Sequence, residues 1–224
     1  MSAISKRNYV QLITENVALR KRKLHLLTSL YDFLDVSEQP MSCDLIVAVA
    51  GREERKSFAM DLFQRGLAPR LILSVARYEV RRTTALPIPG PELLALRDAT
   101  PAPNRHFWID ISNRETSIRR AQLRKTGTWG ELRGLAAYLS PHSVRKIALI
   151  STALHLRRIQ FCCSRIPFFR DKDMVFWAAP GGDSSIHRDQ WWRHARSCKY
   201  LLSEYVKLGG YKLLYRWRYR SLWT

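Results

Sequence analysis

Short apolar runs that alternate with helical patterns constrain the fold of this chain more than any other feature. The runs lie at residues 44–51, 70–75, 106–111, 147–150 and 174–179. Runs of this length, dominated by apolar residues, are typical of strands that are buried on both faces of a sheet. Helical patterns lie between them, among others at Glu53–Arg65, Leu93–Asp98 and Thr128–Ser140. The sequence therefore predicts an α/β fold with a doubly wound, mainly parallel sheet of five strands.

The composition divides the chain into three segments. Residues 1–40 have the pattern of an amphipathic helical extension, residues 41–183 form the α/β domain, and residues 184–224 form a basic helix rich in Trp and Tyr. We expect this last helix to pack its aromatic side chains on the domain, with Gly209-Gly210 as a candidate break. Prolines interrupt residues 77–104, and the polar, basic segment 112–127 shows no strand pattern.

The chain is strongly basic. Its 224 residues include 38 Lys and Arg against 19 Asp and Glu, which gives a formal net charge of +19. Such an excess favours anionic partners: phosphorylated small molecules, anionic lipid or nucleic acid. The arginine-rich composition of a GC-rich genome would explain the same excess equally well.

Targeting and redox features predict a cytoplasmic protein, with peripheral association with the inner membrane as the alternative. Charged residues interrupt the N-terminus, so no signal peptide is expected. No apolar run reaches the ~18 residues that a membrane span needs. Reduced thiols are expected, because no pair has the CxxC spacing of a zinc or redox site. The cysteines are Cys43, Cys162, Cys163 and Cys198.

Side chains that can bind an anion follow the ends of the predicted strands. Because ligands bind beyond the carboxyl ends of strands in open α/β sheets, we expect these residues to meet at one edge. Arginines can hold a carboxylate or phosphate bidentately, and hydroxyl groups could orient a ribose or a sugar. The predicted ligand-binding residues are Gly51, Arg52, Arg55, Ser74, Thr128, Ser151, Thr152 and Arg158. His155 is the candidate catalytic residue, as a hydrogen-bond donor or a general acid or base near pH 7.

The same residues have a simpler explanation. Ser151 or Thr152 could cap the helix that follows, and Thr128 with Glu131 has the spacing of a capping box. The arginines would then be solvated, and His155 would be incidental. No dinucleotide, phosphate-loop, zinc-protease or serine-hydrolase motif is present. His155 lacks a second histidine at helical spacing, so no metal site is expected.

Four motifs occur in the order of a known family: DLIVAVAG at Asp44–Gly51, RxxxA at Arg55–Ala59, RGLAPRLILS at Arg65–Ser74 and STALHLRR at Ser151–Arg158. Over about residues 44–180 the chain resembles the YdcF/SanA/ElyC-like proteins, the domain-of-unknown-function 218 group. The resemblance implies a Rossmann-like three-layer fold. It also implies a ligand site at the following positions of this chain: Gly51, Arg55, Thr128, Thr152, His155 and Arg158.

The resemblance carries functional expectations as well. One member is reported to bind S-adenosylmethionine, which makes that compound a candidate cofactor here. Others are linked to envelope integrity and to peptidoglycan-precursor or lipid-carrier metabolism, and no reaction is firmly assigned to the group. The chain departs from the family at Val75-Ala76, where the second strand usually ends with glycine, and at Gly127–Glu131, where the Asn-Thr-x-Glu-Asn pattern is degraded.

Three functions remain open from the sequence. The protein could bind, or act on, a small nucleotide-like or phosphorylated compound. It could be a membrane-peripheral envelope factor whose basic aromatic tail docks on anionic lipid. It could also bind nucleic acid through its net charge, which is the least expected because a duplex needs an extended basic surface.

Overall fold

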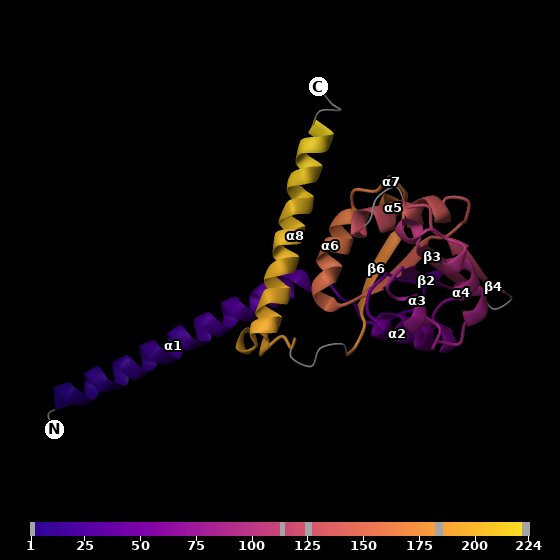
Figure 1. The fold of residues 1–224 in the computed structure, drawn as a ribbon. Coiled ribbons are helices and arrows are strands. Elements are labelled where there is room, and N and C mark those ends of the chain that lie inside the picture. The colour runs from indigo at the N-terminus through magenta and orange to yellow at the C-terminus, as the bar shows by residue number, and fades with distance from the viewer. Residues whose placement is uncertain (1–2, 113–114, 124–126, 182–185, 221–224) are drawn as a thin grey trace.

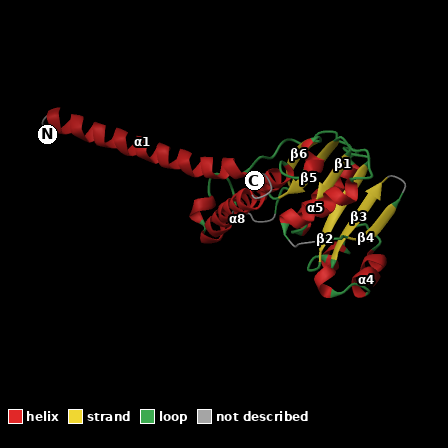
Figure 2. Cartoon of the chain, turned by 90° about the horizontal axis from the view of Figure 1, so that it is seen from above, coloured by secondary structure: helices red, strands yellow, loops and turns green. Residues whose placement is uncertain are grey.

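The structure is a computed structural model that describes residues 3–112, 115–123, 127–181 and 186–220 (Figure 1). A six-stranded sheet has the order β4-β3-β2-β1-β5-β6 (Figure 2). Strand β1 is parallel to β2 and β5, and β5 is parallel to β6, whereas β3 is antiparallel to β2 and β4. The strands are β1 (Leu45–Ala48), β2 (Arg70–Ala76), β3 (His106–Ser112), β4 (Thr116–Arg120), β5 (Lys146–Ser151) and β6 (Asp173–Ala178). The α/β class and the mostly parallel sheet are thereby confirmed.

The sheet differs from the five predicted strands by one edge strand, β4. This strand lies in the segment that shows no strand pattern, because Ile118 is its only buried residue and two exposed arginines follow. A strand that buries a single side chain leaves no apolar run in the sequence. The reversed direction of β3 also departs from a fully parallel sheet, in the way that antiparallel edges often extend α/β sheets.

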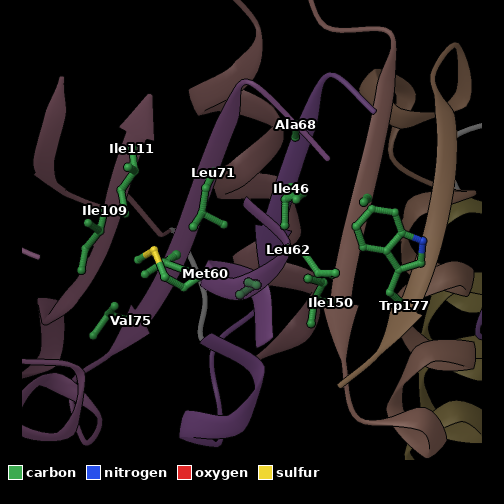
Figure 3. Packing of buried hydrophobic residues seen from close by; sticks show 14 of the residues in the cluster. Ile46, Met60, Leu62, Ala68, Leu71, Val75, Ile109, Ile111, Ile150 and Trp177 are labelled. Atoms are coloured by element: carbon green, nitrogen blue, oxygen red, sulfur yellow. The ribbon is translucent and has the colours of Figure 1, made fainter. Parts of the chain in front are cut away.

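Helices cover both faces of the sheet and give the predicted three layers. Side chains of β1 alternate between the two cores, with Ile46 and Ala48 on one face and Leu45 and Val47 on the other. Figure 3 shows the first core, where Met60 of helix α2 reaches over the strands. The first face carries α2 (Glu53–Gln64), α3 (Val80–Thr83) and α4 (Gly90–Asp98), and the second carries α5 (Thr128–Leu139), α6 (Ala153–Cys163) and α7 (Pro167–Arg170).

The two terminal helices build a third apolar cluster against α6. These helices are α1 (Ala3–Leu34) and α8 (Ala195–Arg220), with the short 3₁₀ helix η2 (Trp191–Arg193) before α8. Leu201 and Leu208 of α8 pack on Leu154 of α6. Helix α8 continues through Gly209-Gly210, so the predicted break is wrong, since packing on both sides of the glycines holds the helix. The N-terminal part of α1 extends away from the rest of the molecule (Figure 1).

None of the helices in the described part of the chain combines the length and the apolarity that crossing a bilayer demands.

Candidate functional site

A cleft of about 1070 Å³ opens at the edge of the sheet where β1, β2, β4 and β5 end. Because β3 runs the other way, its first residues lie at this same edge. The loop with the 3₁₀ helix η1 (Ala102–Asn104) closes one side, and Tyr200 and Glu204 of α8 line it as well. The charged side chains in its walls are Arg55, Arg77, Arg105, Arg120, Arg158, Glu131 and Glu204. The cleft therefore carries a formal excess of positive charge.

The structure brings most of the predicted site residues to this cleft. Those in its walls are Gly51, Arg55, Thr128, His155 and Arg158. Ser74, Ser151 and Thr152 lie behind the wall, and each is hydrogen bonded to a wall residue. Arg52 occupies the N-cap position of α2 and does not line the cleft.

Arg55 is a buried cation with no carboxylate partner among the described residues. Its side chain is 6% exposed. Nη1 donates to the carbonyl of Ala50 at 2.6 Å, Nη2 donates to Thr152 Oγ1 at 3.2 Å, and Nε has no partner among the described atoms. Burial lowers the pKa of the Arg55 guanidinium, although it remains charged at neutral pH. The adjacent Lys56 is buried too, but it is paired with Glu79.

Gly51 is required by the position of Arg55. Its φ of +143° is unfavourable for other residues, and a Cβ atom there would overlap the Arg55 guanidinium. The chain thus leaves β1 through a turn at Gly51, and the Arg55 guanidinium packs directly against the backbone of this turn.

Arg158 is paired within the protein. Its Nε and Nη2 donate to the two carboxylate oxygens of Glu204 at 2.9 and 3.2 Å, and Nη1 donates to Thr128 Oγ1. Lys207 donates to Glu204 at 2.9 Å as well. The bidentate geometry predicted for Arg158 is therefore present, but its acceptor is a buried glutamate of α8. This pair would have to break before Arg158 could hold a ligand in the same way.

His155 lies between two hydroxyl groups. Its Nδ1 is 2.9 Å from Ser151 Oγ, and its Nε2 is 3.2 Å from Thr128 Oγ1. Burial lowers the pKa of His155 well below its ordinary value, and the charges of Arg158 and Arg55 lower it further. This direction disfavours the predicted titration near pH 7. The neutral ring can still hold the Thr128 hydroxyl in one orientation.

Glu131 connects three elements at the floor of the cleft. Its Oε1 accepts hydrogen bonds from the Ala50 amide at 2.7 Å and from Ser74 Oγ at 2.6 Å. His106 Nε2 lies 2.8 Å from the same serine oxygen. Because Ser74 donates to Glu131, the imidazole must donate to the serine. The second Glu131 oxygen has no partner among the described residues and is not enclosed.

The predicted capping box at α5 is wrong, and the predicted cap residue of α6 is present without a side-chain capping bond. Gly127 is the N-cap residue of α5, so Thr128 is the first helical residue and Glu131 does not complete a capping box. Thr152 is the N-cap residue of α6, but its side chain makes no capping bond. Its Oγ1 instead accepts from Arg55 and lies 3.0 Å from the Tyr200 hydroxyl. The hydroxyl groups of Thr128 and Thr152 therefore form hydrogen bonds with other residues of the site and do not cap the helices.

Several residues that line the cleft do not follow the carboxyl end of a predicted strand, so they could not be predicted as site residues. His106 starts its strand, so a parallel arrangement places it at the opposite edge of the sheet. Arg120 ends β4, which is not apparent in the sequence. Tyr200 and Glu204 come from α8, and the helical pattern of the tail does not show that this helix lies beside the cleft.

The cleft and the rest of the described chain hold no cluster of three His, Cys, Asp or Glu side chains that could bind a metal ion. Comparison with known proteins finds no match among family models, curated proteins or solved structures.

Proposed function

We propose that the protein binds a small anionic ligand, nucleotide-like or phosphorylated, in the cleft at the carboxyl ends of the strands. The observation that carries this proposal is Arg55. An enclosed guanidinium without a carboxylate costs free energy, and a bound phosphate or carboxylate would recover it through charge-assisted hydrogen bonds. Gly51 supports the same reading, because its conformation makes room for this one side chain.

The hydroxyl groups of the cleft would orient the ligand. Thr128 Oγ1 is fixed by Arg158 and His155, and Tyr200 is fixed by Thr152. Glu131 can accept a hydrogen bond from a ligand hydroxyl through its open oxygen. In this proposal His155 positions Thr128 and does not carry a charge.

We infer membership of the YdcF/SanA/ElyC-like family from the order of the sequence motifs, and the mostly parallel sheet is compatible with it. On that inference, S-adenosylmethionine is one candidate ligand. Its carboxylate could pair with Arg55, and its ribose hydroxyls could donate to Glu131.

Ligand binding can be tested by exchanging Arg55 for an uncharged residue. A thermal-shift screen with AMP, S-adenosylmethionine and farnesyl phosphate should give at least one probe that stabilises the protein by mass action. In Arg55→Met, binding of that probe should weaken by about 10- to 100-fold, the value of a hydrogen bond to a charged group. Isothermal titration calorimetry measures the change.

Arg65→Met is the matched control, because Arg65 is the C-cap residue of the same helix but is exposed and paired with Asp61. It should bind the probe as the wild type does. Equal affinity of Arg55→Met and wild type would refute Arg55 as the anion-binding group.

A second candidate function is association with an anionic membrane surface, as in a peripheral envelope factor. Tyr205 and Tyr211 of α8 face the rest of the protein, because Tyr205 donates to the Leu30 carbonyl and Tyr211 packs against Arg158. Aliphatic side chains form an exposed stripe instead. Leu202, Val206 and Leu213 share one side of α8 and are 57%, 75% and 61% exposed. Such a stripe beside lysines is typical of an interfacial helix.

A further inference from the structure

The charges in the cleft walls are far from balanced. Of its five arginines, Arg158 has a carboxylate partner in Glu204. The other four have none at ion-pair distance within the described ranges, and Glu131 is the one remaining carboxylate of the walls. These four arginines are Arg55, Arg77, Arg105 and Arg120. One small anion at Arg55 would leave three of these positive charges facing the same space.

The arginines without a carboxylate partner form two groups by the elements that carry them: Arg55 belongs to α2, and the other three lie at the ends of β2, β3 and β4. Arg55 lies at the end of β1, deep in the wall. Arg77 follows β2, Arg105 precedes β3 and Arg120 ends β4, so the second group extends towards the β4 edge. Strands lie about 4.8 Å apart, so the ends of β1 and β4 are separated by about 14 Å. Long arginine side chains that reach inwards shorten this span.

Glu131 lies between the two groups. Its Oε1 is held by the amide of Ala50, just after β1, and by Ser74 of β2. A carboxylate at this position repels an anion and accepts hydrogen bonds from hydroxyl groups. The middle of the cleft therefore suits an uncharged, hydroxylated part of a ligand.

We propose that the cleft takes a ligand with two anionic groups separated by a hydroxylated spacer, of the chemical class of a sugar bisphosphate. One phosphate pairs with Arg55, and the second lies among Arg77, Arg105 and Arg120. A hydroxyl of the spacer donates to Glu131. This inference rests on the proposed function, since Arg55 is the first of the two anion sites. The Nε of Arg105 is engaged by the carbonyl of Thr100 at 2.9 Å, which steadies the second site.

Isothermal titration calorimetry at constant ionic strength can compare fructose 6-phosphate with fructose 1,6-bisphosphate. The wild type should bind the bisphosphate about tenfold or more tightly, the effect of one additional charge-assisted pair. In Arg77→Ala/Arg120→Ala this preference should fall to within about twofold, while the affinity for the monophosphate stays as in the wild type. Pyrophosphate, whose phosphoryl groups are too close to span the cleft, should bind more weakly than the bisphosphate.

Arg119→Ala/Arg133→Ala is the matched control, because it also removes two positive charges. Arg119 and Arg133 are exposed, and neither lines the cleft. This variant should keep the full preference for the bisphosphate. Equal loss in it would show that net charge, and not a second site, determines the preference.

The outcomes separate the two proposals. If both sugar phosphates bind equally well and depend on Arg55, the two-anion inference is overturned and the proposed function stands. If neither sugar phosphate binds, this inference is overturned as well. Titration of the wild type and Arg55→Met with inorganic phosphate and AMP then decides whether the proposed function survives.

Discussion

The neighbours of each polar residue in the cleft determine its protonation and its hydrogen bonding. His155 is the clearest case, since its imidazole is 7% exposed and both ring nitrogens face hydroxyl groups. Two arginines nearby add to the effect of burial, and together they lower the pKa of His155. A histidine in such surroundings is a fixed hydrogen-bonding group at neutral pH, and its neutral form is part of the folded state.

The lowered pKa of His155 predicts a loss of stability in mild acid. Below an unfolded pKa of about 6.5 the unfolded chain takes up a proton that the folded protein does not, so the free energy of unfolding decreases as the pH falls. The slope for one such group is at most about 1.4 kcal/mol per pH unit. Urea unfolding between pH 7.5 and pH 5 should show a shallower pH dependence for His155→Gln than for the wild type. Parallel curves would contradict a neutral buried His155.

At the scale of elements, the sequence predicts the interior well and the edges poorly. Central strands such as β1 and β5 bury both faces and therefore appear as continuous apolar runs. The direction of β3 and the existence of β4 depend on pairing between strands, which leaves little trace in a single segment. For the same reason the residues after β1 and β5 could be predicted as parts of one site, whereas His106 and Arg120 could not.

Helix α8 shows the same limit. Its helical pattern is visible in the sequence, but its contribution to the cleft through Glu204 depends on how it docks against α6. The sequence predicts that this helix packs on the domain, but it does not predict that the helix forms one wall of the site. The two glycines in its middle suggested a break because glycine is a poor helix former, and the packing outweighs that preference.

The continuity of α8 can be tested at Gly209 and Gly210. A Cβ atom at either position would meet no other atom within 4 Å, and neither residue has a positive φ. Alanine at both should raise the free energy of unfolding by about 1–2 kcal/mol, and the melting temperature by several degrees. Thermal unfolding followed by circular dichroism measures the shift.

Gly66→Ala is the matched control for this prediction. Gly66 also has open space around its Cβ position, but its φ of +79° favours glycine. Alanine there should lower the melting temperature. If Gly209→Ala/Gly210→Ala gave no stabilisation, a helix interrupted at these glycines would be the better description.

At the scale of the whole molecule, charge and exposed apolar surface act together. The formal charge of +19 attracts any anionic surface at long range. Attraction of that kind is not specific, and it weakens as salt screens it. The aliphatic stripe of α8 would make the association specific, because it is one defined side of the molecule. Its transfer from water into the lipid surface lowers the free energy. Lys199 and Lys207 are exposed on the same helix, so both contributions can act at one surface.

Membrane association through this stripe predicts flotation with anionic vesicles that depends on Leu202 and Val206. The wild type should float with phosphatidylcholine vesicles that contain phosphatidylglycerol, and much less with phosphatidylcholine alone. Leu202→Glu/Val206→Glu should remain at the bottom of the gradient, because two exposed carboxylates would have to leave water to enter the lipid surface. Met41→Glu/Ala137→Glu changes the net charge equally at exposed sites away from α8, and it should float as the wild type does. If both double variants lost flotation to the same extent, net charge alone would explain the binding, and the stripe would need another role.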